Sequence, residues 1–329
     1  MDINDTHAFS QTVQLYKPPM GLMGLSLVPE NAYDADSARW DQITFSRGVA
    51  PFTSDDAPAT TKPKVGRTLK TAAFGHCKLS NTLNSGDLLA RVPGTVNQVD
   101  PNAHVLRESS NLNTILEKTK ELSIWKMFSG TFASTDIQAA AEGVIFSVDY
   151  GIDGTHKPTA AVSWATSTTN IVGDIKAWKL LAQKDGGLPI TQAIVNSVTM
   201  GYMLINTSVQ NLLGQAAFRE QVGKTGAINE FMGITWKVYD DFYTNPAGTT
   251  TAFVPDDTLI MLPAITTEVA EVIGGHSMVP SGDALSKIIG KYAYSYTSKN
   301  PAGQSVVVGQ KFLPVLKQPN AVIYADVTT

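Results

Sequence analysis

The sequence predicts an α+β fold with two discontinuous lobes. Three observations support this: a long helix is predicted in the first half, a helix-rich segment follows it, and alternating strands return towards the C-terminal end. Helices and strands that come in separate runs are typical of α+β chains. With 329 residues, 43% of them hydrophobic, the chain is long and apolar enough for about two cores.

The composition limits the classes of function. Charged residues make up 16% of the chain, against about 25% in typical globular proteins. Either much of the surface is buried against partners, since interface cores are depleted of charge, or Ser, Thr, Asn and Gln cover it. The net charge of −4 and the pI near 5.7 argue against a general nucleic-acid binder, so we expect any DNA contact to be weak.

The cysteine count and the hydropathy of the chain indicate the cellular compartment in which it is made. The single cysteine, Cys77, excludes an internal disulfide. The sequence shows no signal-peptide pattern and no apolar run of about 18 residues. We therefore expect synthesis in the cytosol and no membrane partner.

Residues 1–60 do not have the pattern of a domain. They hold five prolines, from Pro18 to Pro58, and only short apolar runs. Such a segment buries too little surface to offset its ordering entropy. We expect this N-terminal arm to be mobile in a free subunit and ordered on neighbouring copies, so that its deletion leaves a folded subunit that does not assemble.

Residues 61–99 are predicted to form a long β-hairpin. Asn84-Ser85-Gly86-Asp87 is a strong turn signal between two extended runs. Because an isolated two-stranded hairpin is marginal in water, we expect it to lie on another surface. Its basic residues suit an acidic neighbour, but they are also compatible with solvated charges that protect a strand edge from aggregation. These residues are Arg67, Lys70, Lys78 and Arg91.

The longest helix is predicted over residues 101–129, with a start near residue 110 as an alternative. Asp100 is a suitable N-cap, Pro101 fits the first helical position and Gly130 ends the helix. At 1.5 Å per residue the rod is about 44 Å long. The last turns carry apolar residues around the whole circumference, which predicts burial on both sides. The apolar stripe of the earlier turns consists of Leu112, Ile115, Leu116, Thr119 and Leu122.

Shorter elements are predicted after residue 165. A helix over 171–184 carries Trp178 on its buried face and stops at Asp185-Gly186-Gly187, and two short helices over 199–214 meet near Asn206. Strands are predicted over 190–198, 234–238, 258–262, 291–297, 306–316 and 321–327.

A search for chemistry finds no catalytic, cofactor or metal site. Gly223-Lys224-Thr225 matches the end of a phosphate-binding loop, but the earlier glycine is replaced by Phe218. Asp149 and Asp153 are spaced as in a calcium loop, but Ala160 stands where the closing glutamate is needed. We therefore predict that the protein is not an enzyme and needs no cofactor.

Residues 231–263 carry the clearest resemblance to a known family. They form an alternating strand, a tip with glycine and proline, and an apolar strand that ends at a proline. The segment resembles the phage capsid E family of tailed-phage head-shell proteins, and weaker matches follow in the family's order over roughly residues 18–325. The matching positions are Gly233-Ile234, Tyr239, Asn245-Pro246-Ala247-Gly248, Phe253, Pro255-Asp256-Asp257 and Leu262-Pro263.

The resemblance implies a Hong Kong 97-like major capsid protein fold. In that fold, residues 1–60 are an extended N-terminal arm and residues 61–99 an extended hairpin loop that reaches across an adjacent subunit. Residues 100–168 hold the spine helix and the first part of a peripheral domain, 169–290 form an axial domain, and 291–329 are the return strands of the peripheral domain.

The resemblance also implies a function and partners. The chain would self-assemble, as hexamers and pentamers, into the icosahedral head around phage double-stranded DNA. A scaffolding protein and a portal are expected partners, and a decoration protein is an option. The virion, and the host cytoplasm during assembly, would be its location. The candidate intersubunit contacts are Arg67, Lys70, Phe74, Lys78, Arg91, Glu117 and Glu121.

Two alternatives stay open at this stage. An encapsulin-like nanocompartment shell shares the same architecture. An intracellular α+β enzyme, in which the long helix is an ordinary core helix, would need a polar constellation that the sequence does not show. Because the sequence starts at Met1, we expect no N-terminal maturation cleavage.

Overall fold

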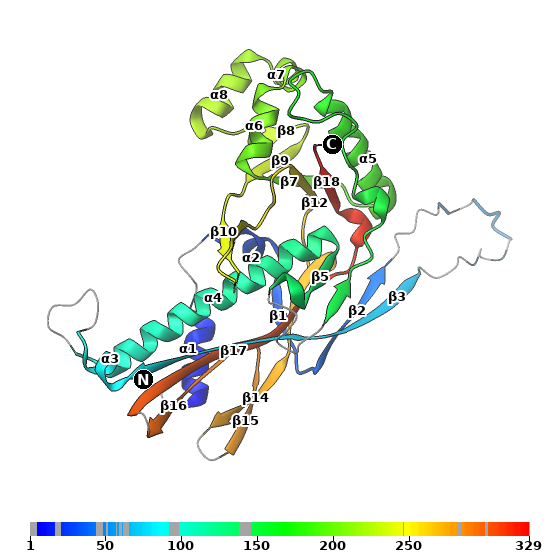
Figure 1. Cartoon of the computed structure of the whole chain (residues 1–329). Helices are drawn as coiled ribbons and strands as arrows, with labels where there is room; N and C mark the ends of the chain where they lie inside the picture. Colours follow the sequence, from blue (N-terminus) through cyan, green and yellow to red (C-terminus); the bar gives the residue numbers. More distant parts are fainter. Residues whose placement is uncertain are drawn as a thin grey trace.

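The computed structural model consists of two lobes, each with its own hydrophobic core (Figure 1). The first lobe combines a long helix with a five-stranded sheet, and the second combines another five-stranded sheet with a group of helices. The predicted α+β class is confirmed. The structure describes residues 5–16, 21–43, 49–50, 52–56, 58, 61, 66–91, 99–137, 146–245, 247–281, 284–299 and 302–328.

The central strand of the first lobe is β17 (Ala302–Leu316). β4 (Gly75–Asn84) pairs with one edge of it, while β16 (Tyr292–Lys299) and β13 (Ala270–Gly274) share the other edge, all antiparallel. β1 (Glu30–Ala32) extends the sheet parallel to β13. β17 is buried along most of its length, because strands flank it and the long helix packs against it.

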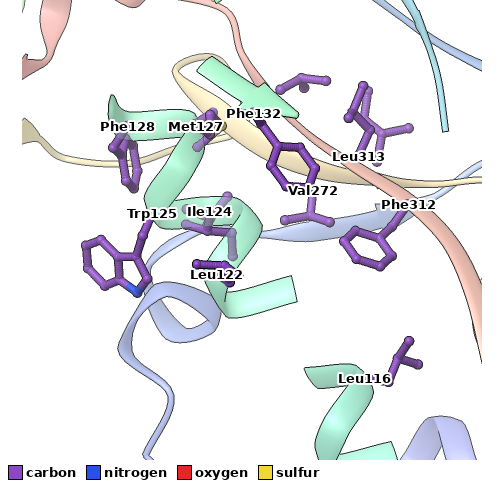
Figure 2. Close-up of a cluster of buried hydrophobic side chains, with 14 of the residues drawn as sticks. Leu116, Leu122, Ile124, Trp125, Met127, Phe128, Phe132, Val272, Phe312 and Leu313 are labelled. Carbon is purple, nitrogen blue, oxygen red and sulfur yellow. The ribbon is translucent and has the colours of Figure 1, made fainter. Parts of the chain in front are cut away.

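The long helix α4 (Pro101–Ser129) begins and ends where the sequence predicts. The Asp100 carboxylate accepts a hydrogen bond from the Asn102 N–H at 3.0 Å, and Gly130 has a φ of 98°, a left-handed conformation that favours glycine. The last turns place apolar side chains in the core of the first lobe, as Figure 2 shows. These side chains are Leu122, Ile124, Trp125, Met127 and Phe128.

The buried face of the earlier turns of α4 differs from the prediction. Ile115, predicted in the apolar stripe, is 51% exposed, whereas Glu117 and Lys120 are buried. The two charged side chains lie inside because groups elsewhere in the chain neutralise them. Hydrophobic periodicity does not reveal such partners, since they are distant in sequence.

The second lobe is built on a sheet with the strand order β18-β12-β7-β9-β8. The helices predicted from the sequence are confirmed: Gly187 ends α5 with a φ of 71°, and the Asn206 side chain caps α7 directly after α6. The elements are β7 (Ile190–Val195), β8 (Glu230–Phe231), β9 (Ile234–Val238), β12 (Thr258–Pro263), β18 (Ile323–Asp326), α5 (Ile171–Gly186), α6 (Ser197–Ile205), α7 (Thr207–Leu213) and α8 (Gln215–Thr225).

Small two-stranded sheets complete the molecule. They are β5 (Thr131–Ala133) with β6 (Ser147–Asp149), β10 (Phe242–Thr244) with β11 (Thr250–Ala252), and β14 (His276–Ser281) with β15 (Ala284–Ile289). Single 3-10 turns lie at Ser134–Asp136, Gly154–His156 and Pro319–Ala321.

Two strands belong to a different lobe from the one that the predicted domain boundaries assign them to. β13 belongs to the first lobe, although the sequence places it in the segment 169–290. β18 belongs to the second lobe, although it falls in the segment 291–329. The pattern of the sequence misplaces both strands because a fully buried strand looks the same whichever sheet it joins.

The predicted hairpin over residues 61–99 is wrong. Both strands of this segment precede the predicted turn: β3 (Arg67–Ala73) pairs with β2 (Ser37–Ile43), and β4 pairs with β17. The described residues 88–91, which follow the turn, form no strand that could pair with β4. The predicted turn at residues 84–87 instead starts a short helix, α3 (Ser85–Leu89), where the Asn84 N–H donates to the Asp87 carboxylate at 3.1 Å. Turn and capping signals share the same residue types, which explains the error.

The prediction that the N-terminal arm is ordered only on neighbouring copies is also wrong for its described residues. They form α1 (Thr6–Leu15), α2 (Met23–Leu27), β1 and β2 on the body of the same chain. Phe9 and Trp40 are buried in the first core, so deletion of residues 1–60 would remove part of that core. Residues 17–20 and 44–48, which include the Pro18-Pro19 pair, lie outside the described residues.

Helix α1 covers the outer edge of β16. The Ser10 hydroxyl accepts a hydrogen bond from the Ala293 N–H at 3.0 Å and donates one to the Ala293 carbonyl at 2.9 Å. The Gln14 amide donates to the Lys291 carbonyl at 2.6 Å. These side chains satisfy backbone groups that an unpaired strand edge would leave open.

Helix α2 is held by a carboxylate from α4. The Glu121 side chain accepts hydrogen bonds from the N–H groups of Gly24 at 2.7 Å and Leu25 at 2.8 Å, and from the Trp125 indole N–H at 2.8 Å. Residue Leu22 at the start of α2 provides no side-chain cap, so Glu121 supplies it from 97 residues away. A Cβ at Gly24 would lie 2.9 Å from the Glu121 carboxylate, which explains the glycine.

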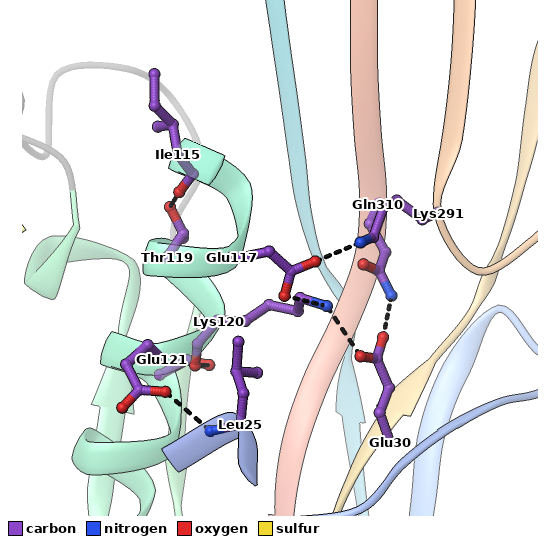
Figure 3. A network of polar contacts seen from close by, with 10 residues as sticks. Leu25, Glu30, Ile115, Glu117, Thr119, Lys120, Glu121, Lys291 and Gln310 are labelled. Carbon is purple, nitrogen blue, oxygen red and sulfur yellow. Dashed lines mark hydrogen bonds and ion pairs between the residues drawn. The ribbon is translucent and has the colours of Figure 1, made fainter. Parts of the chain in front are cut away.

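A buried network of charges joins α4, β1, β17 and Lys291, the residue directly before β16 (Figure 3). The Lys120 ammonium lies 2.9 Å from the Glu30 carboxylate and 3.0 Å from that of Glu117, and Glu117 also pairs with Lys291. The Gln310 amide donates to Glu30 at 2.6 Å. Paired charges of this kind are costly to break, because removing one partner leaves another buried charge alone.

The network shifts the pKa values of its members. Burial raises the pKa of the Glu30 carboxyl, but the charge and hydrogen bond of Lys120 outweigh burial and hold the pKa below its usual value. Burial lowers the pKa of Lys120, but the Glu30 and Glu117 carboxylates raise it above its usual value. Burial and the charge of Lys120 lower the pKa of Lys291.

Replacement of the Glu121 cap should destabilise the isolated subunit. Glu121→Gln puts an NH2 group against N–H donors, so we expect a loss of about 1–3 kcal/mol in the free energy of unfolding, measured by chemical denaturation. Glu220→Gln is the matched control, because Glu220 is 68% exposed and pairs only with Lys224 among the interactions of α8. Equal stabilities of the two variants would contradict the capping role.

The lowered pKa of Glu30 predicts a pH dependence. Because the folded-state pKa lies below the unfolded one, the stabilisation is present above about pH 4.3 and is lost as the pH falls through the folded pKa. We expect Glu30→Gln to be less stable than the wild type at pH 7, and the difference to shrink towards pH 3. Unfolding measured across this range tests it, and a difference that grows on acidification would disprove it.

Candidate assembly surfaces

The seven predicted contact residues do not form one site. Arg67, Lys78 and Arg91 are exposed on separate parts of the first lobe, and Lys70 and Phe74 are half-buried. Phe74 packs against the first core beside Gly275. These five residues stay candidates for contacts between subunits.

Glu117 and Glu121 are different. Their exposures are 5% and 0%, and both carboxylates are occupied by partners within the chain. They are therefore corrected from intersubunit contacts to internal anchors. The sequence suggested solvent exposure because a charge on a helix is usually solvated.

Two of the exposed basic residues contact side chains on other strands. Arg67 lies 3.4 Å from the Asp41 carboxylate across β2 and β3, and both side chains are exposed, so the pair contributes little to stability. The Lys78 ammonium lies 5.6 Å from the centre of the Tyr294 ring, within cation–π range. Neither contact removes the charge from the surface.

Strands β2 and β3, called the ribbon from here on, project from the first lobe (Figure 1). Ala38 and Trp40 anchor one side of β2 in the core. The Gln42 amide donates to the Tyr150 carbonyl at 2.6 Å, which holds the end of β2 that leads into the connection on the first lobe. Ile43 and Leu69, in contrast, are exposed.

The chain between the two ribbon strands carries further apolar residues. Val49 is 88% exposed and Phe52 is fully exposed. A two-stranded ribbon is marginally stable in water, and clustered exposed apolar residues mark interaction sites. The ribbon and its connection are therefore the strongest candidate for a surface that a partner covers.

Two further apolar surfaces lie elsewhere. Helices α6 and α7 expose Val198, Ile205 and Leu212 on the second lobe. The β14–β15 hairpin exposes Met278 and Leu285. Scattered exposed apolar side chains are common, so these surfaces carry less weight than the ribbon.

The sequence patterns that resembled chemical sites lie in a helix end and a turn. The described residues contain no group of three or more His, Cys, Asp or Glu side chains that could hold a metal ion. Gly223, Lys224 and Thr225 lie at the end of α8, where no strand leads into them. Asp149 accepts a hydrogen bond from the Gly151 N–H at 2.8 Å, which is a turn contact.

Within the part of the chain that the structure describes, no helix is long and apolar enough to cross a membrane.

Sequence reasoning missed the pairing that makes the ribbon. A signal was present, because Ala38 and Trp40 alternate with polar residues as in a half-buried strand. The prolines of the arm outweighed that signal. Asn113 was also missed, since an asparagine on an amphipathic helix is usually exposed.

Comparison with solved structures identifies the fold. The putative capsid protein of a prophage of E. coli CFT073 superposes with a TM-score of 0.68 at 13% identity, covering 98% of this chain and 99% of that one. The mature capsid of bacteriophage PhiM1 matches with a TM-score of 0.53 at 11% identity, over 95% and 87% of the two chains. The chain thus has the Hong Kong 97-like fold of phage capsid structures.

An encapsulin has the same fold. The SrpI encapsulin of Synechococcus elongatus matches with a TM-score of 0.51 at 9% identity, over 97% and 94% of the two chains. At such identities the likeness shows the fold alone. A comparison with curated protein sequences found no match.

The family follows from the sequence itself. The model of the family described as phage major capsid protein E matches residues 5–327. This match spans both lobes and includes the arm, the ribbon and β18. The chain therefore belongs to the phage major capsid protein E family.

Proposed function

We propose that this capsid shell protein assembles into hexamers and pentamers of an icosahedral phage head, and that the ribbon of each subunit lies across its neighbour. The observation that supports the proposal is the apolar surface of the ribbon and its connection: Ile43 and Leu69 on the two strands and Phe52 between them are exposed. Only a second surface can remove these side chains from water.

Further features of the chain support self-association. Its arm is occupied by its own body through the Glu121 cap, so the arm does not need a neighbour to fold. The ribbon and its connection, in contrast, keep several apolar side chains exposed. Assembly through area spread over several partners, instead of one pocket, fits a shell with 16% charged residues.

The remaining partners belong to this proposal. A scaffolding protein, a portal and a decoration protein would complete the head, and assembly would take place in the host cytoplasm. Contact with packaged DNA would be weak, because the chain carries a net charge of −4. No chemical reaction is needed for this role, and the protein would not act as an enzyme.

Apolar contacts of the ribbon should control assembly. Leu69→Asn removes a side chain that is 66% exposed in the subunit, so the Tm of the isolated subunit should stay unchanged. Burial of a leucine stabilises a contact by about 1.5–3 kcal/mol, so we expect the subunit concentration needed for particle formation to rise about tenfold or more. Particles are counted by negative-stain electron microscopy and light scattering.

A matched control separates the ribbon from general surface effects. Leu180→Asn removes a leucine of 65% exposure on α5 of the second lobe. If both variants assemble like the wild type, the ribbon is not an intersubunit element. If the wild-type protein itself gives only a small oligomer under conditions that support assembly, the shell function is contradicted.

A further inference from the structure

Strand β4 forms one outer edge of the sheet in the first lobe. All ten of its residues pair with β17 in an unbroken register, and no other strand in the described part of the chain pairs with β4. The outer edge of β16 is covered by α1, whereas β4 has no such cover. An open edge of this length is a template for pairing with another strand.

The register of the sheet shows which backbone groups of β4 point outwards. The N–H and C=O groups of Ala293 on β16 bind the Ser10 hydroxyl of α1, so they point away from β17. Because the bonding direction alternates in antiparallel ladders, Val308, opposite Ala293, directs its backbone groups towards Leu79 of β4. In the middle of β4, the residues whose backbone groups point out of the sheet are therefore Lys78, Ser80 and Thr82.

These outward groups have no partner inside the subunit. Among the described residues, no backbone hydrogen bond outside the β4–β17 ladder involves Lys78, Ser80 or Thr82. All three residues are exposed. Each offers one N–H and one C=O group, so a row of donors and acceptors is open to a second strand.

β4 also lacks the features that protect edge strands from pairing. It contains no proline, no acidic residue and no bulge. Lys78 is its only lysine or arginine. The Lys78 ammonium lies 5.6 Å from the centre of the Tyr294 ring on β16, which is on the far side of β17. This charge therefore lies over the sheet and not along the open edge.

An exposed apolar side chain lies above the same edge. The Asn81 amide of β4 donates to the Glu108 carboxylate of α4 at 2.7 Å, so this face of α4 looks towards β4. Ile115 follows Glu108 by about two helical turns and lies on the same face. It is 51% exposed, and Figure 3 shows it pointing away from the buried charge of Glu117. A partner along β4 would cover Ile115 as well.

A second copy of β4 fits this edge in an antiparallel, twofold arrangement. With Ser80 opposite Ser80 of the other copy, Lys78 lies opposite Thr82, so outward groups meet outward groups and each pair exchanges two hydrogen bonds. No charge then faces a like charge. On the α4 side of the sheet, Cys77 lies opposite Leu83, and both belong to the rim of the first core.

Other twofold registers of the same pairing are unfavourable. An axis at Lys78 would place two ammonium groups opposite each other, and like charges directly opposite are destabilising. An axis at Thr82 would bring Ser80 opposite Asn84, whose N–H already donates to the Asp87 carboxylate at the start of α3. The axis at Ser80 avoids both conflicts.

We propose that β4 of one subunit pairs with β4 of another across a twofold axis at Ser80, so that their five-stranded sheets join into one. A twofold contact uses the same surface on both subunits, so it needs no separate receiving site. The inference rests on the proposed function only in that the partner is a second copy of this chain. It adds a contact that is distinct from the ribbon.

Disulfide trapping tests the register. In a Cys77→Ala background, Ser80→Cys should link two copies in oxidised particles, because opposite residues of a hydrogen-bonded pair have Cα atoms about 5.5 Å apart. The product on a non-reducing gel is a dimer and not a ladder. Thr82→Cys in the same background is the control, because its two copies would lie about 14 Å apart.

A second set of positions tests the same register. Lys78→Cys combined with Thr82→Cys should give dimers, since residues 78 and 82 of opposite copies face each other, whereas Lys78→Cys alone should not. A dimer yield from Ser80→Cys no higher than that from Thr82→Cys would overturn the proposal.

Ser80→Pro separates pairing between subunits from folding. The Ser80 N–H points out of the sheet, so proline removes a hydrogen bond to the partner and leaves the β4–β17 ladder in place. We expect a Tm of the isolated subunit close to that of the wild type, and a rise of about tenfold in the concentration needed for particles. Ser80→Ala keeps the N–H and should assemble like the wild type.

The outcomes distinguish this inference from the function on which it rests. If wild-type particles form but Ser80→Cys gives no dimers and Ser80→Pro assembles normally, β4 is not an interface and the shell function stands. If the proline variant is less stable as a subunit, the disulfide yields decide. If the wild type gives only a small oligomer, the shell function fails, and Ser80→Cys dimers in that oligomer would still support the β4 contact, whereas their absence would contradict both.

Discussion

The fold depends on the carboxylates and ammonium groups that α4 turns inwards. Glu121 caps α2 from the side, and Lys120 links Glu117 on its own helix to Glu30 on the arm. Because these charges are buried, each needs its partner in place. The arm is thereby held on its own lobe, and β1 is kept beside β13 in the sheet.

This anchoring determines what is left for partners. With α1 on the edge of β16 and α2 on α4, the arm resembles a part of the core more than a free extension. β2 continues from this anchored base along the lobe to Gln42 and Ile43, where the connection between the ribbon strands begins. A rigid base with an uncovered projection is suited to reach a neighbour, because little ordering entropy is lost on contact.

Local signals made part of the fold predictable. The ends of α4 follow from Asp100, Pro101 and Gly130, which act within a single turn of the helix. The pairing of β3 with β2, and of β4 with β17, was not predictable, because strand partners are distant in sequence and many strands are compatible with one another. The turn signal at residues 84–87 correctly predicted that an extended run ends there, but the hairpin predicted from it was wrong.

The predicted contact residues show the same limit of local sequence signals. Exposed basic residues such as Arg67 were placed correctly on the surface, since charge predicts solvation. Glu117 and Glu121 were misplaced because their burial depends on Lys291 and on the backbone of α2, which no local pattern announces. Apolar exposure at Phe52 could only be recognised once the surrounding fold was known.

Hydrogen exchange of free subunits and assembled particles tests the central claim most directly. The account predicts that amides of α2 and β1 are protected in both states, because internal charges hold the arm, whereas amides of the ribbon gain protection only in particles. If α2 and β1 exchange rapidly in the free subunit and become protected on assembly, the arm is ordered by neighbours and the account is contradicted.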